Sequence, residues 1–137
     1  MQNQGVIKVR IGEVILFAPK LILCKLVNNH TIRLGDAKEL IEASLKLSEG
    51  SDFVVILDGG TSLEITNEAM SYAANYSSKN WLAFAIIVRT FSDKLFAQYY
   101  IRFTKQVRPT KIFGSPSDSA KWLAQFIPIN TEVKYEI

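Results

Sequence analysis

The chain has 137 residues, the length of one domain, and is long enough to bury a core. Its composition, 48% hydrophobic and 21% charged with a net charge of +3, is ordinary for a soluble globular protein. No apolar run approaches the roughly 20 residues that a membrane-spanning helix needs, so we expect no membrane span.

The positive charge is concentrated in one segment. Residues 79–111 contain seven Lys and Arg against one Asp, whereas both flanking segments are slightly acidic. This segment fits an acidic partner, a phosphate or an anionic surface, and it also fits an ordinary solvated helix face.

The single cysteine, Cys24, cannot form a disulfide within the chain. It lies in an apolar run, which predicts a buried structural thiol. The N-terminus lacks the basic-then-apolar order of a signal peptide, so we expect a reducing, cytoplasmic setting.

The first part of the chain predicts β-strands. Residues 6–11 alternate between apolar and charged side chains, as in a half-buried strand. Two further apolar runs, 13–17 and 21–27, are separated by Pro19, which suits a tight antiparallel connection. A turn at residues 28–30 ends this part.

Helices and strands then alternate. The spacing of apolar residues predicts a helix over about 36–48. The continuous apolar run 52–58 predicts a strand that is buried on both faces. A second helix is expected over 66–78 and a second buried strand over 81–90.

The third helix, over 92–106, combines basic residues on one face with aromatic residues on the others, and we expect the aromatic residues to pack on the sheet. A short strand at 110–114 follows. The last helix has the clearest start in the chain, because Ser115 can cap it and Pro116 can take its first position.

This order predicts an α/β fold. It has a mixed sheet of five to six strands, antiparallel at first and then parallel in strand–helix–strand units, with four helices. We find no repeat or linker, so we expect a single domain with its core over residues 6–127. Residues 128–137 form a tail, either loose or added as an edge strand.

Three strand-to-helix loops, 58–66, 89–92 and 114–117, should meet at the carboxyl ends of the parallel strands, where ligands bind in such sheets. Each leads into a helix N-terminus, which favours anions. The candidate binding or interaction residues are Asp58, Gly59, Gly60, Thr61, Ser62, Thr66, Arg89 and Ser92. The alternative is that Thr66, Ser92 and Ser115 only cap their helices.

No complete catalytic set is present, so we predict no enzyme and no cofactor. The strand that ends in Asp58 lacks the glycine-rich Lys-Ser/Thr loop of nucleotide hydrolases. One histidine and one cysteine cannot make a soft-metal site, and carboxylates such as Glu64 and Glu68 are more often solvated than metal-binding. The aromatic and basic mixture of the third helix also occurs in single-strand nucleic-acid binders. Because we expect its aromatic residues to be buried, we predict no nucleic-acid partner.

Residues 35–50, 54–60 followed by 64–70, and 107–123 resemble the STAS-like family, the fold of bacterial anti-sigma-factor antagonists, which is related in shape to CRAL-TRIO lipid-binding domains. The resemblance covers roughly residues 10–126 and is closest to a short stand-alone branch common in Bacteroidetes. The most specific matches are Pro109, Lys111, Ile112, Phe113, Ala120, Trp122 and Leu123.

This resemblance implies a non-enzymatic regulatory or protein-interaction module that acts through its 58–66 loop on another protein. In the antagonists, a serine in an Asp-Ser-Ser-Gly-like motif at the matching helix start is phosphorylated. That motif is absent here, and Thr66 is the nearest candidate phosphoacceptor. The alternative function is binding of a small molecule, anion or lipid, either near Arg89 or in an apolar pocket under the third helix. A homodimer is left open.

Overall fold

The computed structural model describes residues 5–61 and 64–128. These residues form four helices and a mixed sheet of six strands, which confirms the predicted fold class. The elements are β1 (Val6–Val9), β2 (Gly12–Ala18), β3 (Leu21–Leu26), β4 (Thr31–Ile32), α1 (Leu34–Ser48), β5 (Phe53–Asp58), β6 (Glu64–Ile65), α2 (Asn67–Asn75), β7 (Trp81–Ile87), α3 (Phe91–Phe103), β8 (Thr110–Phe113) and α4 (Pro116–Leu123).

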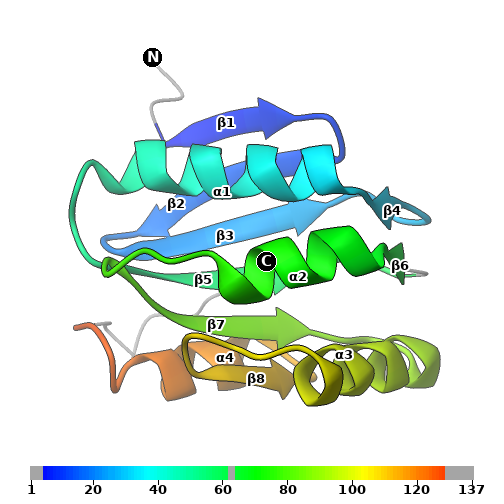
Figure 1. Ribbon diagram of the computed structural model, residues 1–137. Coiled ribbons are helices and arrows are strands. Elements are labelled where there is room, and N and C mark those ends of the chain that lie inside the picture. The colour runs from blue at the N-terminus through cyan, green and yellow to red at the C-terminus, as the bar shows by residue number, and fades with distance from the viewer. Residues whose placement is uncertain (1–4, 62–63, 129–137) are drawn as a thin grey trace.

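The strands of the main sheet lie in the order β1-β2-β3-β5-β7-β8 (Figure 1). The first three are antiparallel, and β3, β5, β7 and β8 are parallel. The turn between β2 and β3 follows Pro19 and places Lys20 at a positive φ of 66°. The chain therefore builds an antiparallel hairpin first and extends it by parallel strand–helix–strand units, as predicted.

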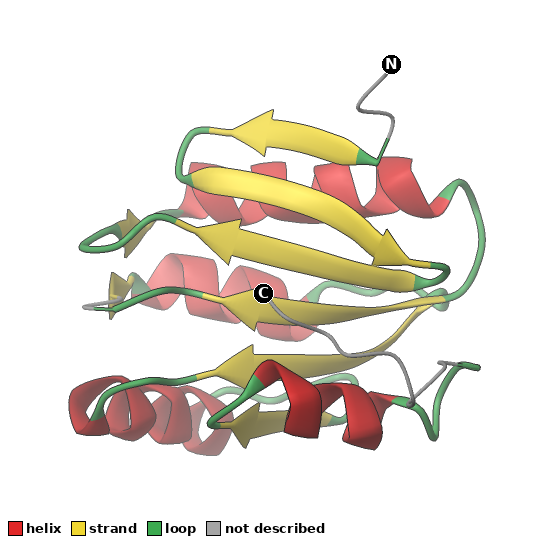
Figure 2. Ribbon diagram, turned by 180° about the vertical axis from the view of Figure 1, so that it is seen from behind, coloured by secondary structure: helices red, strands yellow, loops and turns green. Residues whose placement is uncertain are grey.

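Helices cover both faces of the sheet. Helices α1, α2 and α3 lie on one face (Figure 1), and α4 lies on the other (Figure 2). All six residues of β5 are buried because this central strand is covered on both sides. Val55 and Leu57 belong to the core under α1–α3, whereas Val54 and Ile56 belong to the core under α4.

Helix α1 begins at Leu34, two residues before the predicted start. The cause is Asp36, whose carboxylate accepts a hydrogen bond from the Arg33 N–H at 3.0 Å. The same carboxylate accepts two hydrogen bonds from the Arg10 guanidinium, at 2.6 and 2.7 Å. Asp36 is thus the third residue of the helix, in the first turn where a negative charge is favourable, rather than its first residue.

The structure also contains a second, two-stranded sheet that was not predicted. Strands β4 and β6 pair in parallel over two residues each, at the ends of the segments that follow β3 and β5. The backbone bonds from Glu64 N to His30 O, at 3.1 Å, and from Thr66 N to Ile32 O, at 3.0 Å, extend this pairing. The described residues just before α1 and α2 are therefore joined by backbone hydrogen bonds.

Candidate functional site

The predicted site at the carboxyl ends of the parallel strands is partly assembled. Asp58, at the end of β5, forms an ion pair with Arg89, which follows β7. The carboxylate of Asp58 is buried and also accepts a hydrogen bond from the Gly60 N–H at 3.2 Å. Two of the three predicted loops therefore meet, and the charge of Arg89 is compensated within the protein.

The loop after Asp58 is held in one conformation by the turn at Asn28. The Thr61 N–H donates to the Asn28 side-chain oxygen at 3.0 Å, and the Asn29 N–H donates to the Thr61 carbonyl at 2.9 Å. Gly60 has a positive φ of 71°, and a Cβ at this position would clash with the Asn28 side chain. Gly60 therefore permits the close approach of the Asn28 side chain. Ser62 lies outside the described residues.

The hydroxyl groups near this edge cap their own helices. The Thr66 oxygen accepts from the Ala69 N–H at 3.2 Å and caps α2. The cap of α3 is Thr90, which accepts from the Asp93 N–H at 3.0 Å, so the alternative that Ser92 caps this helix is wrong. Ser92 is an exposed residue inside the first turn of α3. Ser115 caps α4 as predicted, but on the opposite face of the sheet.

In residues 5–61 and 64–128, no group of three or more His, Cys, Asp or Glu side chains is placed to hold a metal ion. Across these same ranges, no helix is both long enough and apolar enough to cross a membrane.

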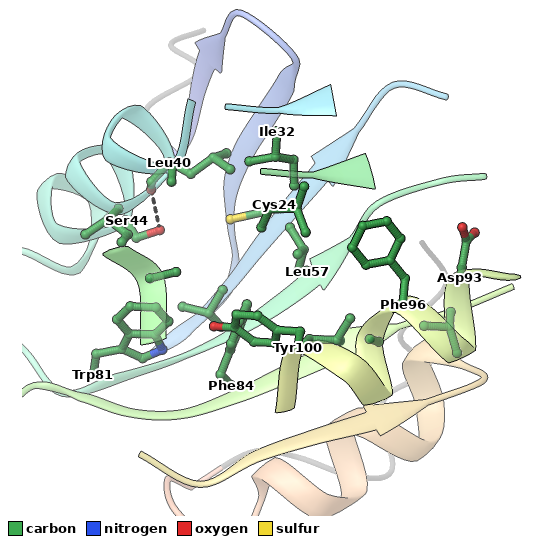
Figure 3. Close-up of a pocket in the computed structure, with 18 of the residues that line it drawn as sticks. Cys24, Ile32, Leu40, Ser44, Leu57, Trp81, Phe84, Asp93, Phe96 and Tyr100 are labelled. Carbon is green, nitrogen blue, oxygen red and sulfur yellow. Dashed lines mark hydrogen bonds between the residues drawn. The ribbon is translucent and has the colours of Figure 1, made fainter. Parts of the chain in front are cut away.

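An apolar pocket lies on the face of the sheet that α1, α2 and α3 cover, between the sheet and these helices. Its volume is about 90 Å³, and its floor is formed by side chains of β3, β5 and β7. Residues of α1 form one wall and residues of α3 form the opposite wall (Figure 3). Ile32 of β4, Ile65 of β6 and Ala73 of α2 complete the lining.

Few polar side chains reach this pocket. Cys24 projects into it from β3, and burial raises the pKa of its thiol to about 12. The Ser44 hydroxyl donates to the Leu40 carbonyl at 2.9 Å, and the Trp81 indole N–H donates to the Ala83 carbonyl at 3.1 Å. Tyr100 extends from α3 across the pocket, with its hydroxyl directed towards Trp81 (Figure 3).

Arg108 packs against the ring of Trp81, one of the residues that line the pocket. Its guanidinium lies 3.6 Å from the centre of the Trp81 ring and donates hydrogen bonds to the carbonyls of Trp81, Ala73 and Tyr76. Burial lowers the pKa of Arg108, because the charge is withdrawn from water. The cation lies at the carboxyl end of α2, where a positive charge is favourable.

The outer face of α3 is unexpectedly apolar. The prediction that its aromatic residues pack on the sheet is wrong for Tyr99 and Phe103, which are 48% and 65% exposed. Phe91, which lies just before the predicted helix, is 75% exposed. With Leu95, these three residues form a stripe in which each residue follows the last by four positions. Only Asp93, Ala97 and Tyr100 of α3 are buried, so the helix contacts the core along a narrow strip.

The structure brings four of the candidate residues together. Asp58, Gly60, Thr61 and Arg89 are brought together at the sheet edge, but their polar groups are largely engaged with the protein. Sequence reasoning named Tyr100 only as an apolar residue of its helix, and it did not single out Arg108. The signal for the pocket was the set of small residues that face the sheet from three different helices, Ala37, Ala73 and Ala97.

Comparison with known proteins gives one match. No curated protein and no solved structure matches the chain. A sequence model of a protein family, described as a domain of unknown function (DUF7793), matches residues 16–127. This range runs from β2 to the residues that follow α4 and includes every residue of the pocket. The chain therefore belongs to the DUF7793 family.

Proposed function

We propose that the protein is a non-enzymatic binding module that holds a small apolar ligand in the pocket beneath α3. The observation that carries this proposal is the pocket itself, which is lined almost entirely by aliphatic and aromatic side chains. Ligand sites in proteins are typically concave and mainly apolar, with a few polar groups that orient the ligand.

The energetics of packing support this function. Protein interiors contain few voids larger than a water molecule. By the cost of residual cavities in mutated cores, an unfilled cavity of 90 Å³ destabilises the fold by about 2 kcal/mol. A bound apolar molecule would recover part of this free energy, so the gap favours a ligand over a purely structural origin.

The packing of α3 supports a route to the pocket. This helix forms one wall of the pocket but buries only three residues, in contrast to the eight buried residues of α1. A wall with few buried contacts opens at a lower free-energy cost than the rest of the fold.

The proposal includes a reducing, cytoplasmic setting. The buried free thiol of Cys24 on the pocket floor supports this setting.

The test is a titration with toluene, a small apolar probe, followed by NMR of the methyl groups of Ile32, Leu40 and Leu57. We expect these signals to shift in a saturable manner. The variant Ala97→Leu places a larger side chain in the pocket from α3 and should abolish the shifts. The control Gln98→Leu adds the same side chain at the neighbouring exposed position and should leave binding unchanged.

A lack of saturable shifts in the wild-type protein would contradict the proposal, as would equal binding by Ala97→Leu. Native mass spectrometry of freshly purified protein provides a second measurement. A bound mass that is lost on denaturation, and that is absent from Ala97→Leu, would identify the natural ligand by its mass.

A second candidate function is a STAS-like regulatory module that contacts another protein. The observation in its favour is the exposed stripe of α3, with the Arg102 guanidinium 6.0 Å from the centre of the Phe103 ring. Lys94 and Lys105 add positive charge to the same helix and the residues that follow it. Aromatic and arginine side chains are enriched in protein interfaces, and the charge favours an acidic partner.

This candidate is tested by co-purification with Phe103→Ser, which removes one aromatic residue of the stripe. The control Val27→Ser changes an exposed apolar residue far from α3. A protein partner retained by the wild type and the control, but lost from Phe103→Ser, would support the candidate. Because these aromatic residues are exposed, the reason for predicting no nucleic-acid partner does not hold. If nuclease treatment removed the co-purified material, the partner would be a nucleic acid and the candidate of protein contact would be contradicted.

A further inference from the structure

Tyr100 is the polar group that the pocket leaves without a partner. Its side chain is 95% buried, since only 5% of the residue is exposed, and it lines the pocket. Within residues 5–61 and 64–128, its hydroxyl meets no hydrogen-bond partner. Leaving a buried hydroxyl unsatisfied is costly, so such a group in a native fold calls for an explanation.

The neighbouring polar groups are engaged elsewhere. The amide of Gln106 lies close enough to affect the pKa of Tyr100, but its nitrogen donates to Thr104 and its oxygen accepts from Thr110 at 3.3 Å. Ser44 and Trp81 donate to backbone carbonyls. The phenol hydrogen of Tyr100 therefore has no acceptor among the described residues.

The charge state of Tyr100 agrees with a role as a donor. Burial raises the pKa of its phenol to about 12. The hydroxyl therefore keeps its proton at every physiological pH. A ligand group that meets it must accept a hydrogen bond, which a carbonyl or ether oxygen does and a hydrocarbon does not.

We propose that the ligand of this pocket is a compact apolar molecule with one acceptor oxygen, such as a ketone or an ester, and that Tyr100 donates a hydrogen bond to this oxygen. The inference rests on the proposed binding function and adds the chemical class of the ligand. Tyr100 and Asp93 are the polar side chains of α3 in a lining that is otherwise mainly apolar, and Tyr100 is the neutral donor of the two, so the ligand needs an acceptor at the Tyr100 end and hydrocarbon over most of its surface.

The experiment compares two probes of equal shape, cyclohexanone and methylenecyclohexane, which differ by an oxygen in place of a CH₂ group. Each is titrated into wild-type protein and into Tyr100→Phe, with the methyl signals of Leu40 and Leu57 as the readout. We expect Tyr100→Phe to weaken cyclohexanone binding about five- to tenfold, the value of one hydrogen bond. Binding of methylenecyclohexane should be unchanged or slightly tighter.

The control Tyr99→Phe removes a hydroxyl from the exposed face of the same helix and should change neither affinity. Equal loss of both probes in Tyr100→Phe, or no loss of either, would overturn the role of Tyr100 while leaving apolar binding intact. Failure of both probes to bind the wild-type protein would instead overturn the binding function itself. Thermal unfolding of Tyr100→Phe at wild-type temperature or above would show that the variant is folded.

Discussion

Asp36 connects α1 to the turn between β1 and β2. Its carboxylate is buried and accepts hydrogen bonds from Arg10 and from the Arg33 N–H. The Arg10 hydrogen bond, more than any other contact, holds the pKa of Asp36 below its ordinary value. A carboxylate with a lowered pKa stabilises the folded state above the pKa of the unfolded chain, near 4, and loses this effect as the pH falls further.

We therefore predict that Asp36→Asn lowers the free energy of unfolding at pH 7. The difference from wild type should shrink as the pH falls from about 5 towards 2, because the wild-type carboxylate is then protonated as well. Chemical denaturation at pH 7, 5 and 3 measures this. Glu42→Gln, on the exposed side of α1, serves as the control. A difference of the same size at pH 3 as at pH 7 would contradict the role of the ion pair.

Arg108 acts through packing and hydrogen bonds rather than through an ion pair. It donates to three backbone carbonyls, and its guanidinium lies over the Trp81 ring. We predict that Arg108→Ala lowers the free energy of unfolding by about 2–4 kcal/mol, because the buried carbonyls lose their donors. Urea denaturation measures the loss. Exposed Arg102→Ala should change stability by less than about 0.5 kcal/mol, and an equal loss in both variants would refute the assignment.

Helix α3 differs from α1 in how firmly it is held. It buries three of its residues and presents an apolar stripe to solvent. We predict that backbone amides of α3 exchange with deuterium at least about tenfold faster than those of α1, because local opening of α3 exposes less apolar surface. Hydrogen-exchange mass spectrometry measures the ratio. Equal protection of the two helices would contradict the prediction, and slower exchange of α3 with cyclohexanone would link its opening to the pocket.

Most elements could be predicted because their signals are local. The β5 run from Phe53 to Asp58 is continuous and apolar, and the start of α4 is marked by Ser115 and Pro116, so both were correctly predicted. The orientation of α3 could not be predicted, because its apolar residues surround most of the helix and periodicity does not select one face. The ion pair of Arg10 with Asp36 joins residues 26 positions apart and leaves no local pattern.

The candidate site was harder to predict than the elements. The residues of the sheet edge, such as Asp58 and Arg89, follow from the rule that parallel strands end together. The pocket is the space left unfilled by side chains of elements that are distant in sequence. Small residues such as Ala73 and Ala97 help to create this space, but their effect can be recognised only once the fold is known.

Cys24 and Tyr100 make the stability of the whole molecule sensitive to alkali. Burial raises the pKa of each to about 12, from ordinary values of 9.0 and 10.0. An acid whose pKa is raised on folding stabilises the protein below its unfolded pKa, and this stabilisation is lost as the pH rises through the folded value. As the pH rises, the unfolded chain releases both protons before the folded protein does. Above pH 9 this lowers the free energy of the unfolded state relative to the folded state.

We predict that the free energy of unfolding falls between pH 9 and 12 by an amount on the order of 5 kcal/mol, a large part of the stability of a typical domain. Circular dichroism during denaturation at pH 8, 10 and 11 measures the fall. The double variant Cys24→Val with Tyr100→Phe, which keeps the side-chain shapes close to native, should flatten this dependence. A wild-type stability that stays constant up to pH 11 would show that these groups are not protected from solvent.

The small pairing of β4 with β6 has a consequence for how the family could diversify. It fastens the segments before α1 and α2 to each other, through backbone bonds that depend little on side-chain identity. The part of the pocket lining that β4 and β6 supply is thereby fixed by backbone bonds, whereas α3 contributes a wall through its side chains. Under the proposed binding function, we expect related chains to differ in ligand through changes in α3, with the remaining architecture left intact.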